Sequence, residues 1–258
     1  MSAADRPEVL SERRGRMLII TLNRPDQRNA VNAAVAQGVA AALDELDADS
    51  ELSLGVLTGA GKGFCSGMDL KAFRAGEPSH VPGRGFAGIV ERPPAKPLIA
   101  AIEGFAVAGG LEVALACDLI VAARGARLGI PEVKRSLVAA GGALLRLPRT
   151  IPRNVAMELA LTGELIDAER AYSLGLVSRL AEPGAALEAG LELAETIAAN
   201  GPLALAATKR IMVESVDWPE AEFFARQREI NIPVRESEDA REGAAAFAER
   251  REPVWKGR

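Results

Sequence analysis

The sequence predicts an α/β fold that becomes purely helical towards its C-terminal end. In the first part of the chain, short strand-like apolar runs alternate with helical stretches, a pattern expected of βαβ-type units. After about Pro183 only amphipathic helical patterns follow. The 258 residues are 48% hydrophobic and 26% charged, enough to bury a full core as one domain with an appendage or as two small domains. We therefore divide the chain into a core of residues 1–183 and a C-terminal helical region of residues 184–258.

The individual elements follow from the spacing of apolar residues and of turn residues. In the core, strands are predicted at Met17–Asn23, Leu54–Thr58, Leu98–Ile102 and Leu119–Ala122, and helices at Ala33–Asp47 and Leu111–Cys117. In the C-terminal region, breaks at Asn200-Gly201-Pro202 and Trp218-Pro219 separate the helical patterns. The four helices predicted there are Ala185–Ala199, Pro202–Glu214, Pro219–Arg228 and Ser237–Arg250.

Glu112 stands in the run Ala106–Ala123, where nearly every neighbour is small and apolar. Desolvating an ionised carboxylate that has no partner is expensive, so a Glu at such a position needs a reason. Gly109 and Gly110 precede it where a strand-loop turns into an alanine-rich helix, and the free N–H groups of a helix start can approach a ligand closely at glycines. Two interpretations stay open: a catalytic carboxylate, or a Glu that hydrogen-bonds the backbone within the fold.

A second segment carries closely spaced glycines after the predicted strand Leu54–Thr58. It is not a P-loop, because Gly63 follows Lys62 where Ser or Thr is required, and it lacks the third glycine of the dinucleotide fingerprint. Asp69 can cap a short helix that begins near Leu70. The segment therefore predicts bare backbone N–H groups close to a ligand, with Lys62 and Lys71 available for an anionic group.

A third segment begins at Leu128 and contains Glu132, which follows Pro131 and precedes a helix-like run. Pro-Glu at a helix start is also a common structural arrangement that suits the helix dipole. Taken singly, Glu132 is open to both interpretations.

Together, six segments resemble the crotonase (enoyl-CoA hydratase/isomerase) superfamily, in the family's order and over nearly the whole chain. They are ITLNRPDQRNAV (20–31), GKGFCSGMDLK (61–71), EGFAVAGGLEVALACDLIVAA (103–123), IPEVKRSL (130–137), LTGELIDAERAYSLGLVSRL (161–180) and EGAAAFAERREPVWKGR (242–258). The resemblance implies a spiral of ββα units with a C-terminal helical region that packs in trimers, commonly paired into hexamers.

The resemblance also implies a site and a reaction. The backbone N–H groups of Met68 and Gly109 would hold the thioester oxygen of an acyl-CoA, and the family's hydratases carry glutamates at the positions of Glu112 and Glu132. By resemblance, Glu112 activates the water and Glu132 supplies the Cα proton of a 3-hydroxyacyl-CoA. An isomerase can manage with one glutamate, usually at the Glu132 position, so the presence of both favours an enoyl-CoA hydratase. The residues expected to bind CoA are Arg28, Lys62, Ser66, Asp69, Lys71 and Arg250.

Other reactions of the same family, and a non-catalytic role, also fit the sequence. The same residues suit enoyl-CoA isomerisation, carnitinyl-CoA-type dehydration or thioester hydrolysis. A non-catalytic member that binds acyl-CoA or RNA as a scaffold is also possible, although keeping both glutamates and both glycine turns argues against it.

The sequence departs from the family pattern at three places. Residues 139–143 read AAGGA where many members have Pro-Gly-Ala-Gly-Gly, and Met68 stands where Ala is frequent. The Gly- and Pro-rich segment 73–94 contains His80, the only histidine. We interpret this segment as a mobile loop near the acyl pocket, and His80 as a solvated loop residue rather than a catalyst.

The composition of the chain limits the binding partners and the cellular location that can be expected. The net charge of −4 and the pI near 5.4 argue against a general nucleic-acid surface, so local cations would meet the CoA phosphates. Cys65 and Cys117 lie in segments expected to be packed, which favours a reduced cytoplasmic protein over a disulfide framework. The polar N-terminus predicts no signal peptide, and three acidic residues and three glycines argue against a membrane span at Leu98–Ala123. No metal and no cofactor besides the CoA of the substrate are expected.

Overall fold

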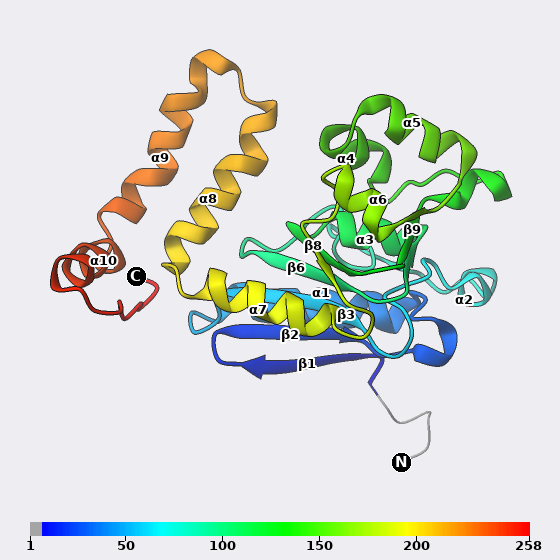
Figure 1. Cartoon of the computed structure of the whole chain (residues 1–258), viewed down its shortest axis with the longest axis horizontal. Helices are drawn as coiled ribbons and strands as arrows, with labels where there is room; N and C mark the ends of the chain where they lie inside the picture. Colours follow the sequence, from blue (N-terminus) through cyan, green and yellow to red (C-terminus); the bar gives the residue numbers. More distant parts are fainter. Residues whose placement is uncertain (1–6) are drawn as a thin grey trace.

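A six-stranded sheet forms the centre of the molecule in the computed structural model, which describes residues 7–258 (Figure 1). The strands lie in the order β1-β2-β3-β6-β8-β11. Only the edge strand β1 runs antiparallel to its neighbour; all other pairs in this sheet are parallel. The strands are β1 (Val9–Arg14), β2 (Met17–Leu22), β3 (Leu54–Gly59), β6 (Leu98–Ile102), β8 (Leu119–Ala123) and β11 (Arg179–Ala181).

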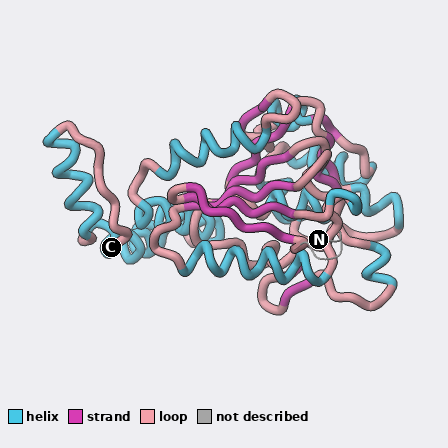
Figure 2. Tube along the Cα trace, turned by 90° about the horizontal axis from the view of Figure 1, so that it is seen from below, coloured by secondary structure: helices cyan, strands magenta, loops and turns pink. Residues whose placement is uncertain are grey.

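Both faces of this sheet are apolar and covered by helices, as parallel sheets require. Alternate residues of β2 enter two different cores: Leu18 and Ile20 pack with helix α1 (Ala33–Ala48), whereas Met17 and Ile19 pack with helix α7 (Ala186–Ala198). Figure 2 shows the strand layer between helices. Because α7 belongs to this sandwich, the part of the chain that leaves the core begins at α8; the division at residues 183 and 184 stays a prediction.

Two smaller sheets frame the first turn of helix α3 (Gly109–Leu115). One has the order β10-β9-β7, formed by β10 (Ile166–Asp167), β9 (Arg127–Gly129) and β7 (Phe105–Val107), and β7 leads directly into α3. The other is the hairpin of β4 (His80–Val81) and β5 (Gly85–Phe86). The remaining helices of this part are η2 (Pro25–Gln27), α2 (Leu70–Arg74), η3 (Pro131–Arg135), α4 (Ala143–Thr150), α5 (Arg153–Thr162) and α6 (Ala168–Ser173).

The last helices form a C-terminal arm (residues 202–258) that extends away from the sheet in Figure 1. It contains α8 (Pro202–Glu214), η4 (Ser215–Asp217), η5 (Glu220–Glu222), α9 (Phe223–Arg235) and α10 (Glu238–Glu249). Phe224 and Phe247 are 70% and 88% exposed on this arm. The tail folds back, since Trp255 donates to the carbonyl of Ala199 at 2.8 Å. The tail is thus tied to the end of α7, whereas Phe247 is left uncovered within the chain.

The predicted strands and helices of the core are confirmed to within two residues, and three expectations need correction. The helix predicted at Pro219–Arg228 begins instead at Phe223 and continues to Arg235. Pro233 stands in its last turn, so the backbone donor that proline lacks is missing near the helix end rather than in the middle. Strand β1 was not predicted, since five of its six residues are exposed and carry little apolar pattern. The segment 73–94, expected to be a loop, contains the β4–β5 hairpin.

The apolar stretch Leu98–Ala123 is not one helix but β6, β7, α3 and β8 in succession. Within residues 7–258, no helix is both long and apolar enough to cross a membrane. The expectation about a signal peptide rests in part on residues 1–6, which lie outside the described residues.

Candidate active site

A cavity of about 370 Å³ lies where the first turn of α3 meets the loop after β3, the β4–β5 hairpin and η3. It brings together most of the residues that the sequence indicated, although they come from four separate segments. Of those residues, the cavity is lined by Arg28, Ser66, Met68, Gly109, Glu112 and Glu132. Its other walls are mainly apolar, among them Leu70, Phe86, Val107, Leu137 and Val138.

Four of the residues expected to bind CoA are not part of this wall. Lys62 and Lys71 are exposed to either side of it, and Arg250 lies at the end of α10 on the C-terminal arm. The Asp69 carboxylate caps α2, where it accepts hydrogen bonds from the N–H groups of Lys71 and Ala72, and it pairs with Arg24 at 3.0 Å. The structure thus confirms the helix cap and gives the Asp69 side chain partners within the fold.

The two N–H groups expected to hold the thioester oxygen lie on adjacent stretches of backbone. A Cβ at Gly67 would come within 3.0 Å of the Gly109 nitrogen. Residue 68 forms a parallel bridge with Val31, in which Gly67 accepts and Asp69 donates, so the N–H of Met68 points to the other side. Among residues 7–258, neither the Met68 nor the Gly109 N–H has a hydrogen-bond acceptor.

The start of α3 is strained and closely packed. Ala108, the N-cap, has φ of 54° and ψ of −133°, a combination that residues with a Cβ rarely adopt. Its N–H donates to the Gly129 carbonyl at 2.9 Å, so strand β9 helps to hold it there. A Cβ at Gly109 would lie 2.6 Å from the Phe86 ring, and one at Gly110 would collide with the Cys65 carbonyl. Both glycines are therefore required by close packing as well as by access to a ligand.

Glu112 is 4% exposed, and the backbone of residues 141–143 packs against its carboxylate. One carboxylate oxygen accepts a hydrogen bond from the Ala143 N–H at 3.2 Å, and Gly141 packs directly against the other. Burial raises the pKa of Glu112 above its usual range, while the backbone N–H groups of Ala143 and Gly141 and the charge of Arg146 oppose the rise. The sequence AAGGA at residues 139–143 thus still forms a turn that donates to this carboxylate.

Glu132 has a different environment in the same cavity. It stands in the first turn of η3, and its Oε2 is buried with no hydrogen-bond partner in the described chain. Burial raises the pKa of Glu132 to about 7, and the negative charge of Glu112 adds to that rise. Near neutral pH, Glu132 is therefore present in both its protonated and its ionised form, beside a second carboxyl group in the same cavity, an arrangement suited to acid–base catalysis.

His80 was expected to be a solvated loop residue, and the structure corrects its position. The side chain is exposed, but it lines the cavity and stacks edge-on against Phe86 with ring centroids 5.6 Å apart. Its charge lowers the pKa of Glu112, a smaller effect than those of burial and of the backbone donors. No sequence motif pointed to this position; the His-Val and Gly-Phe pairs of the hairpin are too short to predict.

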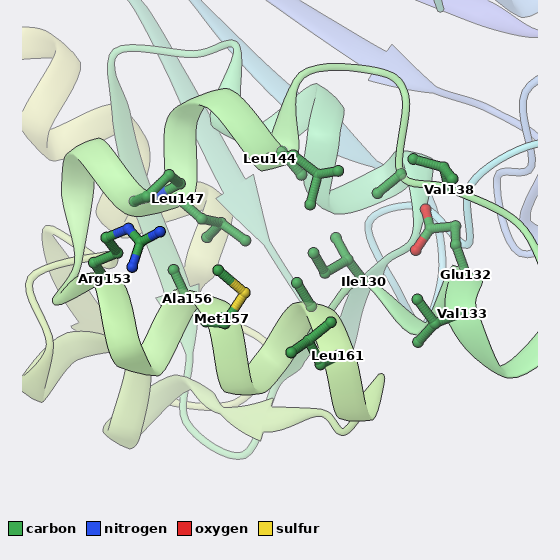
Figure 3. A pocket seen from close by; sticks show the side chains of 14 residues that line it. Ile130, Glu132, Val133, Val138, Leu144, Leu147, Arg153, Ala156, Met157 and Leu161 are labelled. Atoms are coloured by element: carbon green, nitrogen blue, oxygen red, sulfur yellow. The ribbon is translucent and has the colours of Figure 1, made fainter.

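A second cavity of about 430 Å³ adjoins the first at Glu132 and Val138 (Figure 3). Side chains from η3, α4 and α5 line it and leave it almost entirely apolar, with Ile130, Leu147, Met157 and Leu161 among them. The Glu132 carboxylate is its polar end in Figure 3, and Arg153 lies at the opposite end. Apolar space is thus available immediately beyond the two glutamates.

Residues 12–258 match the enoyl-CoA hydratase/isomerase family. The chain belongs to this family. Enoyl-CoA hydratase EchA19 of Mycobacterium tuberculosis is 44% identical over 98% of this chain and 97% of its own length. A carnitinyl-CoA dehydratase of Salmonella paratyphi B is 40% identical over 95% of this chain and 97% of its own length.

Solved structures confirm the predicted crotonase-type fold. The crystal structure of an enoyl-CoA hydratase from M. tuberculosis H37Rv superposes with a TM-score of 0.97 at 63% identity, and the match covers 98% of this chain and 100% of that chain. The predicted superfamily and its α/β architecture are therefore correct.

Proposed function

We propose that the protein is an enoyl-CoA hydratase, which adds water reversibly to a 2-enoyl-CoA to give a 3-hydroxyacyl-CoA. The observation that carries the proposal is the pair of unlike carboxyl groups in one cavity. Glu112 accepts a hydrogen bond from the Ala143 N–H, whereas Glu132 has a pKa of about 7 and a buried oxygen without a hydrogen-bond partner in the described chain. Addition of water needs one group that accepts a proton and one that donates a proton at the same time.

In the proposed mechanism the thioester oxygen accepts hydrogen bonds from Met68 and Gly109. Glu112 takes a proton from water as the water oxygen bonds to Cβ, and the electron pair of the double bond moves towards the thioester oxygen. Fixed donors stabilise the negative charge that develops there. Cα then takes the proton of Glu132, which leaves the hydroxyl on Cβ, the new hydrogen on Cα, Glu112 protonated and Glu132 ionised. Exchange with solvent restores both groups, and the roles reverse in dehydration.

Carnitinyl-CoA dehydration is the second candidate, favoured by the dehydratase relative at 40% identity. It breaks the same Cα–H and Cβ–O bonds, so the same four groups would serve, and the two candidates differ in the acyl substituent. Isomerisation would leave Glu112 without a task, and hydrolysis would leave Glu132 without one. A non-catalytic scaffold would leave two buried carboxyl groups in the cavity without a compensating function.

Binding of the CoA moiety is proposed to involve Arg28 and Ser66 at the cavity, with Lys62, Lys71 and the Asp69 segment beside it, and Arg250 of a neighbouring copy. We also propose the homotrimer, or a hexamer of two trimers, because the C-terminal arm exposes Phe224 and Phe247. A cytoplasmic location is proposed as well; both cysteines are free thiols, as in reducing compartments.

A panel of 2-enoyl-, 3-enoyl- and 3-hydroxyacyl-CoA substrates of varied chain length, including carnitinyl-CoA, tests the function. Hydration consumes the absorbance of the conjugated thioester, whereas isomerisation of a 3-enoyl-CoA creates it. We expect loss of absorbance with 2-enoyl-CoA. If the protein forms the conjugated product from 3-enoyl-CoA and leaves 2-enoyl-CoA untouched, it is an isomerase.

A further inference from the structure

Arg146, on helix α4, is a cation placed behind the cavity and outside its lining. Its Nη2 donates to the Val90 carbonyl at 2.6 Å, and its Nη1 reaches the Gly141 carbonyl at 3.5 Å. Within residues 7–258 no carboxylate lies at ion-pair distance from this guanidinium, whereas Arg149, on the same helix, is exposed and pairs with Asp217. Burial lowers the pKa of Arg146, which means that the protein environment disfavours its charge. A cation kept in such a place needs a compensating anion.

Glu112 is the acidic group that most strongly favours the charge of Arg146. The connection runs through the donor turn, residues 141–143. Gly142 has φ of 101°, and a Cβ there would collide with Nη1 of Arg146, so the guanidinium lies directly against the turn. On its other side the same turn donates the Ala143 N–H to Glu112. One guanidinium therefore ties this turn to residue 90, in the segment that follows the β4–β5 hairpin.

We propose that Arg146 is a positioning residue for Glu112: it fixes the donor turn through the carbonyls of Gly141 and Val90, and its positive charge favours the ionised carboxylate. The inference rests on the proposed function, in which Glu112 accepts a proton from water. Arg146 touches neither substrate nor water in this role, and it acts through the turn and through its field.

Other ionisable groups also act on Glu112 and Arg146. Glu112 faces Glu132 from η3, His80 from the β4–β5 hairpin and Arg146 from α4. Arg146 faces Glu112 and Cys117, and burial raises the pKa of that thiol, which stays neutral. The charge of Arg146 lowers the pKa of Glu112 more than that of His80 does. Removing its charge should therefore make Glu112 harder to ionise.

The experiment is the pH profile of kcat/KM for a 2-enoyl-CoA in the full-length enzyme. Arg146→Gln removes the charge but leaves an amide that can still donate to a carbonyl, and Arg146→Lys keeps the charge but loses the planar fork. We expect the acidic limb of Arg146→Gln to move up by about 0.5–1 pH unit. For Arg146→Lys, the acidic limb of the profile should lie at the same pH as in the wild type, because the charge is kept. Its kcat should fall, because the hydrogen bond to the Val90 carbonyl is weakened. Arg149→Gln is the matched control and should reproduce the wild-type limb.

The measurements distinguish a positioning role of Arg146 from a purely structural role and from failure of the proposed function. A purely structural role lowers the melting temperature of Arg146→Gln without moving its acidic limb, and that result overturns the proposal. If Arg146→Gln does not fold, Arg146→Met replaces it under the same expectation. If neither neutral variant folds, a wild-type kcat in Arg146→Lys overturns the positioning role. A wild type that hydrates no 2-enoyl-CoA contradicts the proposed function instead, a result distinct from an unmoved limb in an active enzyme.

Discussion

The cavity that holds both glutamates and the C-terminal arm differ in which side chains they bury and which they expose. In the cavity, polar groups are withdrawn from water and positioned: Glu112 is 4% exposed and accepts a backbone hydrogen bond. On the arm, large apolar groups face solvent, with Phe247 88% exposed. The cavity thus brings its polar groups together within one chain, whereas the arm leaves large apolar side chains uncovered, as interaction surfaces often do. Substitutions in the first region should alter turnover, and those in the second should alter binding and assembly.

The largest expected effect follows Glu112→Gln and Glu132→Gln. Each amide keeps the shape of the side chain but cannot exchange the proton, and a positioned acid or base contributes roughly 10²–10⁴ in rate. We expect kcat for 2-enoyl-CoA hydration to fall by about that factor while the oligomeric mass and melting profile stay near the wild type. A loss smaller than about tenfold in either variant would remove that glutamate from the proton transfers.

The next effect concerns the N–H of Gly109. Gly109→Pro removes the donor, and loss of one such donor costs roughly 10²–10³ in kcat. Gly109→Ala keeps the N–H, but its Cβ would lie 2.6 Å from the Phe86 ring, so activity should fall for a steric reason. Adding Phe86→Leu should restore activity to Gly109→Ala and not to Gly109→Pro. Equal rescue of both would contradict the role of the N–H group.

A smaller effect is expected from the arm, where Arg250 and Arg251 stand side by side. Arg251 pairs with Glu242 and Glu249 at 2.5 and 2.6 Å, whereas Arg250 ends α10 in a left-handed conformation with no such partner in the described chain. We expect Arg250→Ala to weaken binding of a non-reactive acyl-CoA by about 1.5–3 kcal/mol, the value of a charge-assisted hydrogen bond, and Arg251→Ala to leave the affinity unchanged. Calorimetry measures both, and unchanged affinity in Arg250→Ala excludes this residue.

Removal of residues 245–258 tests the arm as an assembly element. The deletion takes away Phe247, half of α10 and the Trp255 contact with Ala199. It should lower the light-scattering mass at micromolar concentration and also weaken acyl-CoA binding. A deletion variant of wild-type mass would show that the exposed aromatic residues of the tail do not hold the oligomer.

The smallest effect is the pH dependence of the wild type. For hydration, Glu132 must be protonated and Glu112 ionised. Because the pKa of Glu132 is raised to about 7, kcat/KM should fall as pH rises above about 7. Because burial raises the pKa of Glu112 above its usual range, activity should also be lost on acidification, when Glu112 takes up a proton. The two limbs belong to the coupled pair rather than to either residue alone. The range from pH 6 to 9 extends about two pH units above the pKa of Glu132. If kcat/KM stayed constant over that range, the acid role of Glu132 would be contradicted.

The four central residues of the site were predicted from the resemblance of six segments to the crotonase superfamily, whereas Glu112 and Glu132 taken singly left a catalytic and a structural interpretation open. Glu112, Glu132, Met68 and Gly109 do meet in one cavity. Strands β2, β3, β6 and β8 were predictable because apolar runs between turn signals specify buried parallel strands.

What escaped prediction depends on contacts between distant segments. Arg146 resembles any other surface cation in sequence, and only the fold places it against the donor turn of Glu112. His80 reaches the cavity through a hairpin of two-residue strands that no periodicity reveals. The continuation of α9 through Pro233 runs against the usual role of proline as a helix terminator, so the sequence pattern favoured an earlier end.

Exchange of the Cα proton with solvent tests the division of labour between the two glutamates most directly. Butyryl-CoA in D₂O offers a Cα proton but no leaving hydroxyl, so exchange needs only the group that serves Cα and the two N–H donors. We expect the wild type and Glu112→Gln to incorporate deuterium at Cα, and Glu132→Gln to lose the exchange by about 10² or more. Exchange at the wild-type rate in Glu132→Gln would contradict the assignment of Glu132 as the acid that protonates Cα.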